Sequence, residues 1–159
     1  MVQNRSTVIA VAALVGLLAV VMAVVSVKLS PLDKSDAAFV VEQAYVTGIG
    51  FAEEEAVTYL SLTNRTGQDD RLIGARSALA HDAMLHRQGE GDAGAAPTTQ
   101  ITDGIALPDG AQHRFAPGGD HLMLSRLIEP LVQGAIVPIT LVFERAGDVP
   151  ISVLVDLDR

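Results

Sequence analysis

Two histidines and two methionines of this chain share one spacing. After residue 30 the only methionines are Met84 and Met123, and each lies two residues from a histidine, His86 or His121. In an extended strand residues i and i+2 point to the same side, so each pair would present one imidazole and one thioether to the same space. Soft metal ions, above all Cu(I), bind this combination of ligands. The spacing also allows a second interpretation, in which both methionines fill gaps in the core.

The absence of cysteine limits the chemistry further. None of the 159 residues is a cysteine, so the chain forms no disulfide, carries no lipid on a cysteine and offers no thiolate to a metal. A metal site must therefore use histidine, methionine, carboxylate or water. An electron carrier of the blue-copper type is disfavoured, because those centres include a cysteine ligand.

The N-terminal part predicts a membrane segment. Residues 8–27 form an uncharged run of 20 apolar or small residues between Arg5 and Lys28, which is long enough to cross a bilayer as a helix. A secretory signal peptide is the close alternative, but residues 22–27 contain no clear small-x-small cleavage site. We expect residues 1–30 to be a transmembrane anchor, or else a cleaved signal segment. In both cases the rest of the chain lies in the periplasm or outside the cell, either anchored to the membrane or secreted.

The rest of the chain divides into a polar linker, residues 31–37, and one domain, residues 38–159. All 19 acidic residues but only nine of the 11 basic residues follow residue 30, so the formal charge of this part is −10. Such a surface repels phosphate backbones and anionic membranes, which argues against binding to nucleic acid. The length is sufficient for a hydrophobic core without disulfides.

Many short strands separated by turn signals are expected in this domain. Runs of β-branched or alternating residues end at clusters of Gly, Pro, Asn or Asp. This pattern predicts an all-β fold, a two-sheet sandwich or a barrel. The expected strands are residues 38–46, 57–64, 72–75, 83–87, 101–107, 111–115, 121–124, 136–145 and 151–157. Residues 88–99 are rich in Gly, Ala and acidic residues and predict a flexible loop.

One segment carries a resemblance to a known family. Residues 115–124 read Phe-Ala-Pro-Gly-Gly-Asp-His-Leu-Met-Leu, which resembles the signature Leu-x-Pro-Gly-Gly-x-His-x-Met-Leu of the PCu(A)C-type periplasmic copper chaperones. Weaker matches extend the resemblance over about residues 46–155. They include Tyr59, Leu60, Leu62, Asn64, Leu72, Ala75, Ser77, Leu85, His86, Leu107, Pro108, Gly110, Leu127, Pro130, Leu131, Gly134, Val137, Ile139, Leu141, Phe143 and Gly147.

The resemblance implies a fold, a cargo and a partner. The fold would be a cupredoxin-like Greek-key β-sandwich that holds one copper ion, Cu(I) being favoured, outside the cytoplasm. The partner that receives the copper would be a copper-accepting protein such as a cytochrome c oxidase subunit. Carried over residue by residue, the family's ligands correspond to His86, His121 and Met123.

The family's second ligand, a methionine, does not carry over. The family's usual interval before His121 leads to Thr99, and no methionine lies between His86 and His121. Three interpretations stay open. Met84 could supply the thioether from the same face as His86, or His86, His121 and Met123 could bind copper as a three-ligand site. Alternatively the site has degenerated and the domain is a protein-interaction module without metal.

Other polar residues have plainer expected roles. His81 lies five residues from His86, so a regular strand would turn it to the opposite face, and we expect it to be exposed. His113 adjoins a turn and is expected at the surface. Asp120 adjoins His121 but points away from it in a strand, where it could support another histidine. The sequence contains no Gly-x-Ser-x-Gly nucleophile turn, and the domain is not expected to be an enzyme.

Overall fold

The computed structural model describes residues 38–48, 54–89 and 97–159. The predicted membrane segment, residues 8–27, and the linker, residues 31–37, lie outside these residues. In the described part no helix is long and apolar enough to cross a membrane. The strands are β1 (Phe39–Gly48), β2 (Glu55–Asn64), β3 (Asp70–Ser77), β4 (Ala80–Gln88), β5 (Thr98–Gln100), β6 (Ile105–Leu107), β7 (Gln112–Phe115), β8 (Asp120–Leu127), β9 (Ile136–Phe143) and β10 (Gly147–Val155).

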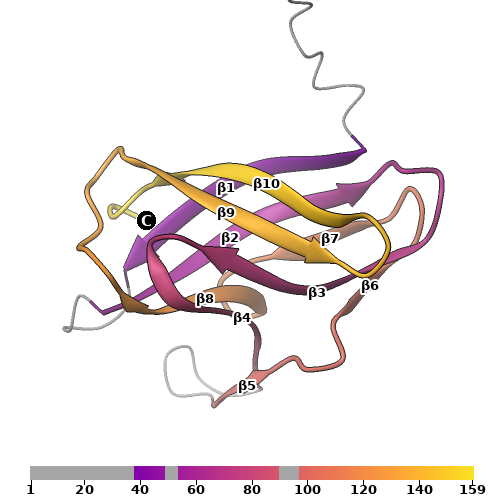
Figure 1. Cartoon of the computed structure of the whole chain (residues 1–159). Coiled ribbons are helices and arrows are strands. Elements are labelled where there is room, and N and C mark those ends of the chain that lie inside the picture. The colour runs from indigo at the N-terminus through magenta and orange to yellow at the C-terminus, as the bar shows by residue number, and fades with distance from the viewer. Residues whose placement is uncertain (1–37, 49–53, 90–96) are drawn as a thin grey trace, which may run out of the picture. The chain divides into compact units, whose positions relative to one another are not determined.

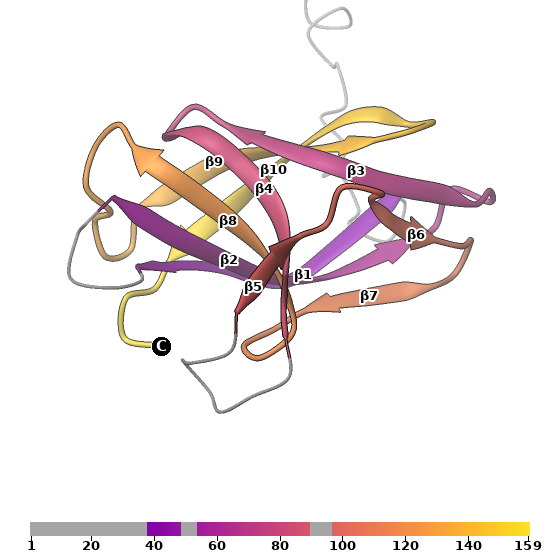
Figure 2. The same ribbon diagram turned by 90° about the horizontal axis from the view of Figure 1, so that it is seen from below.

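The strands form one hydrogen-bonded, mixed sheet. Its order is β5-β4-β8-β2-β1-β10-β9-β3-β6, with β7 paired to β2. The sheet curls, so that β3 and β9 lie across the core from β2 and β7 (Figures 1 and 2). The predicted all-β class is confirmed, but the two layers are not separate sheets. β1 and β10 run parallel and pair at Tyr45 with Leu154 and Val46 with Val155, which joins the layers.

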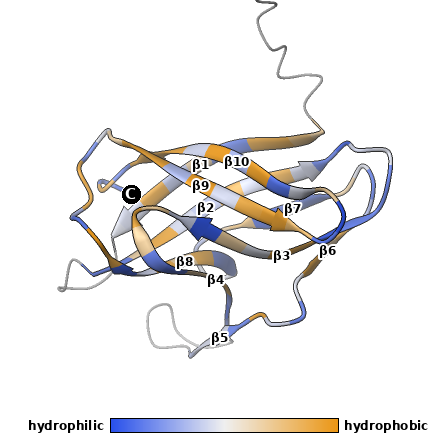
Figure 3. Ribbon diagram, in the orientation of Figure 1, coloured by the Kyte–Doolittle hydropathy of each residue, from blue (hydrophilic) through white to orange (hydrophobic). Residues whose placement is uncertain are grey.

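Alternation between buried and exposed residues defines the core. In β9 every second side chain is buried, and β8 buries Leu122 and Leu124 on its inner side. Figure 3 shows the resulting succession of apolar and polar residues along the strands. A single pleated face therefore supplies the core while the other face stays free for polar side chains. The largest fully buried side chains are Phe143, Leu60, Leu62, Leu72, Leu107, Leu122, Leu124, Ile139, Leu141, Val46, Val153 and Val155.

A β-bulge in β1 decides which side chains face outward near its end. The register between β1 and β2 shifts between Glu42 and Tyr45, and Gln43 within the shift has a positive φ of 52°. Such an extra residue reverses the alternation. After the bulge Val46 enters the core, so Tyr45 points to the outer face, opposite Tyr59 on β2.

One predicted strand is shorter than expected. Of residues 101–107 only Ile105–Leu107 are extended, as β6. Gly104 before them has a positive φ of 70°, and a Cβ at this position would lie 2.6 Å from the carbonyl oxygen of Leu72. The chain therefore turns at a glycine that β3 approaches closely, and this turn ends the extended run. The predicted loop, residues 88–99, contributes to a strand at its end, because Thr98–Gln100 pair with β4 as β5.

Candidate metal centre

The four predicted ligands lie on two neighbouring strands as two cross-strand pairs. β4 and β8 are antiparallel, and Met84 is the register partner of Met123 while His86 is that of His121. Directly opposed residues point to the same face, with Cβ atoms about 4.5–5.5 Å apart. Leu85 lies between the two pairs on β4 and is buried in the core, so the four side chains project from the outer face. The structure thus brings together all four residues.

The two imidazoles lie edge to face. Their ring centroids are 5.8 Å apart, with an interplanar angle of 68°. His121 Nδ1 lies 3.0 Å from the carbonyl oxygen of Gly119. Because a carbonyl only accepts hydrogen bonds, Nδ1 carries the proton, and Nε2 keeps its lone pair for a metal. The Gly118–Gly119 turn therefore supplies the carbonyl oxygen that accepts this hydrogen bond and orients His121, the histidine of the His-x-Met pair.

The second imidazole has an unpaired polar atom. His86 Nδ1 is buried and has no hydrogen-bond partner among the residues that the structure describes. Burial, together with the nearby His121, lowers the pKa of His86 below its ordinary value of 6.5, although Glu55 acts in the opposite direction. The imidazole is therefore neutral at pH 7, the form that can bind a metal.

Asp120 makes polar contacts on the opposite side of β8 from the four predicted ligands. Its carboxylate accepts hydrogen bonds from Arg87 and lies 3.2 Å from Nε2 of His113. The hydrogen bonds from Arg87 lower the pKa of Asp120, against the opposing effect of burial. The surface position expected for His113 is wrong: its side chain is 26% exposed and packs edge to face on Phe115. β7 pairs with β2 so that His113 opposes the core residue Leu62, which turns its ring inward.

The residue that β5 places opposite His86 is not Thr99, the position that the sequence interval indicates. β5 pairs with β4 so that Thr99 opposes Arg87 and Gln100 opposes His86. Gln100 therefore shares the outer face with His86, and Thr99 faces the other way. Sequence reasoning missed Gln100, because residues 88–99 lacked a strand signal and the pairing of β5 depends on a distant part of the chain.

Two tyrosines continue the row of rings on the outer face. The Tyr59 ring centroid lies 6.4 Å from that of His121 and 5.3 Å from that of Tyr45. Burial and the neighbouring Tyr45 raise the pKa of Tyr59. The guanidinium of Arg159 lies 4.8 Å from the centre of the Tyr45 ring. Sequence reasoning missed both tyrosines, since the bulge that places Tyr45 leaves no clear sequence signal.

Outside this face the described residues offer little metal chemistry. On every face, the described residues contain no group of three or more His, Cys or carboxylate side chains that could hold a metal ion. His81 is exposed in β4, as expected.

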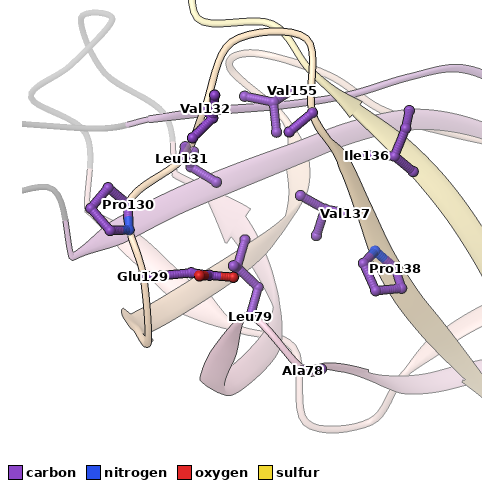
Figure 4. Close-up of a pocket in the computed structure, with 11 residues that line it drawn as sticks. Ala78, Leu79, Glu129, Pro130, Leu131, Val132, Ile136, Val137, Pro138 and Val155 are labelled. Atoms are coloured by element: carbon purple, nitrogen blue, oxygen red, sulfur yellow. The ribbon is translucent and has the colours of Figure 1, made fainter.

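An apolar pocket of about 280 Å³ lies beyond Ala80, at the far end of β4 from His86 (Figure 4). It is lined by Ala78, Leu79, Glu129, Pro130, Leu131, Val132, Ala135, Ile136, Val137, Pro138 and Val155.

Comparison with protein families identifies the relatives of this chain. The family described as "Putative lipoprotein LpqE-like" matches residues 25–155. The chain belongs to the LpqE-like family. The "Putative lipoprotein Lxx21020" of Leifsonia xyli subsp. xyli (strain CTCB07) is 33% identical over 82 residues, which are 52% of this LpqE-like chain and 49% of that protein. The chain thus spans about half the length of this relative.

Solved structures confirm the resemblance to the PCu(A)C family. The copper-bound PCuAC domain from PmoF2 has a TM-score of 0.59 and 28% identity, and covers 76% of this LpqE-like chain and 94% of that domain. The apo PCuAC domain from PmoF1 has a TM-score of 0.62 and 25% identity, covering 76% and 95%. The Cu(I) form of DR1885 from Deinococcus radiodurans has a TM-score of 0.59 and 27% identity, covering 75% and 78%.

Proposed function

We propose that this LpqE-like protein is an extracytoplasmic copper chaperone that holds Cu(I) and passes it to a partner, without being an enzyme. One observation carries the proposal: two His–Met pairs face outward as direct cross-strand neighbours on β4 and β8. Two imidazoles and two thioethers suit Cu(I) and exclude the hard ions that prefer oxygen ligands. On this proposal the curled sheet is a variant of the cupredoxin-like Greek-key sandwich.

Each of the four proposed ligands has its own role in holding copper. His121 presents Nε2 because the carbonyl oxygen of Gly119 accepts a hydrogen bond from Nδ1–H, and the lowered pKa keeps His86 neutral. Met84 and Met123 are half-buried, and their thioethers keep lone pairs at any pH. His121 is buried, whereas Met84, His86 and Met123 are half-buried, so a partner's ligands would reach the copper at the half-buried side chains while the chaperone's ligands leave one at a time.

The partner and the location follow from the same proposal. We infer that the recipient is a copper-accepting protein such as a cytochrome c oxidase subunit. Residues 1–30 would anchor the domain in the membrane, or would be removed so that the domain is secreted. The family is described as lipoproteins, but none of these 159 residues is a cysteine that could carry a lipid.

Competition for Cu(I) tests this function. The full chain in detergent is titrated with Cu(I) in the presence of a chromophoric Cu(I) chelator under reducing conditions. We expect one Cu(I) per chain, and a lower Cu(I) affinity in His121→Ala and in Met123→Ala. His81→Ala is the control, since His81 is exposed in the same strand as His86 but on the other face. No Cu(I) binding, or binding unchanged in both variants, would favour a protein-interaction module with a degenerate site.

A further inference from the structure

The outer face next to His86 holds a donor that neither the family pattern nor the sequence interval indicates. Gln100 is the register partner of His86, and His86 is in turn the partner of His121 on its other side. The three residues therefore form one row across β5, β4 and β8, with their side chains on the same face. We propose that Gln100 is a further donor to the copper beside the two His–Met pairs, its side-chain amide oxygen lying next to His86 in this row.

Gln100 is the oxygen donor that lies directly opposite His86 on this face. Thr99 opposes Arg87 and points away from the histidines. Glu55 also faces outward and acts on the charge of His86, but it opposes Ser125, one outward-facing row along β8 beyond Met123. Gln100 is exposed, so packing does not fix its amide, and its strand partner His86 has a buried Nδ1 without a hydrogen-bond partner in the described part of the chain.

The donor type determines which oxidation state the site prefers. A thioether favours Cu(I), whereas a carbonyl-type oxygen is harder and is compatible with Cu(II). Gln100 in this position would therefore lower the preference for Cu(I) relative to a methionine and allow the site to retain copper after oxidation. This inference rests on the proposed copper-binding function and specifies the oxidation states that the site accepts.

Three substitutions in β5 test the role of Gln100. Gln100→Met provides a thioether at the proposed position, Gln100→Leu removes the donor, and Thr99→Met places a thioether on the opposite face. For each full-length variant in detergent we would measure the Cu(I) affinity by chelator competition, the Cu(II) affinity, and the reduction potential of the bound copper by voltammetry. The midpoint of thermal unfolding checks that the fold is retained.

The expected pattern separates the two methionine variants. Gln100→Met raises the Cu(I) affinity and the reduction potential, because it adds a soft thioether, whereas Thr99→Met leaves both unchanged. Gln100→Leu lowers the Cu(II) affinity and also raises the potential. The inference is overturned if wild-type protein binds Cu(I) but Gln100→Met behaves like Thr99→Met, or if Gln100→Leu leaves the Cu(II) affinity unchanged. If wild-type protein binds no Cu(I), the proposed function fails together with this inference.

Discussion

Arg87 and Asp120 connect β4 and β8 by two hydrogen bonds, one residue beyond the pair of His86 and His121. Arg87 Nε donates to Asp120 Oδ1 at 2.6 Å, and Arg87 Nη2 donates to Oδ2 at 2.8 Å. The two residues are register partners, so this two-point contact holds β4 and β8 in the alignment that sets the histidines opposite each other.

Asp120→Asn should therefore destabilise the domain at neutral pH. The pKa of Asp120 is lowered by the hydrogen bonds from Arg87, so its contribution to stability is present above the ordinary carboxyl pKa of 3.8. This contribution is lost as the pH falls through the lowered pKa. We expect urea unfolding at pH 7 to show a loss of about 1–3 kcal/mol. Below the lowered pKa of Asp120, the free energies of unfolding of Asp120→Asn and of the wild-type protein should differ less.

Asp82→Asn provides the matched control. Asp82 accepts a hydrogen bond from Arg126 at 2.9 Å across the same two strands, but the Asp82 and Arg126 side chains are 41% and 67% exposed. Water screens such a pair, so the expected loss at pH 7 is below about 1 kcal/mol. Equal losses in Asp82→Asn and Asp120→Asn would contradict a special role for Asp120.

The sequence predicted the fold class but not the connection between its layers. Alternating residues and turn clusters marked most strands, since burial on one face leaves a period of two in the sequence. The parallel pairing of β1 with β10 joins Tyr45 to Leu154, over 100 residues apart, and no local pattern encodes it. β5 was missed for the same reason, because its three residues become a strand only by pairing with β4.

The candidate site was more predictable than its surroundings. The i, i+2 spacing alone placed Met84 with His86 and His121 with Met123, because side chains alternate in any strand. The register that sets these pairs directly opposite each other arises from tertiary pairing and could not be read from the chain. Asp120 contacts His113, which is not one of the predicted ligands, so its support of a metal-bound histidine stays a prediction.

Protonation of His86 should occur at lower pH than in an ordinary histidine. Burial and the neighbouring His121 lower the pKa of His86 below 6.5. Because the pKa of His86 is lower in the folded protein than in the unfolded chain, its contribution to the free energy of unfolding is fully present above pH 6.5. This contribution is lost as the pH falls through the lowered pKa. An NMR titration of the apo protein, with His86→Gln used for assignment, should give a midpoint below 6.5. A midpoint at or above this value would contradict the proposed environment of His86.

Copper should quench the two tyrosines unequally. The chain has no tryptophan and only two tyrosines, and Tyr59 contacts the ring of His121 while Tyr45 lies one strand further. We expect Cu(II) to quench the emission of Tyr45→Phe, which retains Tyr59, more strongly than that of Tyr59→Phe. Equal quenching in the two variants would place the metal elsewhere.

The two methionines should contribute similarly to Cu(I) binding. Leucine conserves volume, so Met84→Leu and Met123→Leu should each cost less than about 1.5 kcal/mol of stability. Each removes one thioether, and we expect at least about a tenfold loss of Cu(I) affinity in chelator competition, since loss of a ligand costs no less than loss of an outer-shell partner. Loss in Met123→Leu alone would mean that the site uses His86, His121 and Met123 without Met84.

X-ray absorption spectroscopy of the Cu(I)-loaded full chain tests the central claim most directly. If the outer face of β4 and β8 holds the metal, the spectrum contains both nitrogen from His86 and His121 and sulfur from Met84 and Met123. The sulfur contribution should then disappear in the double variant Met84→Leu, Met123→Leu. A first coordination shell of nitrogen and oxygen alone in the wild-type protein would contradict the account.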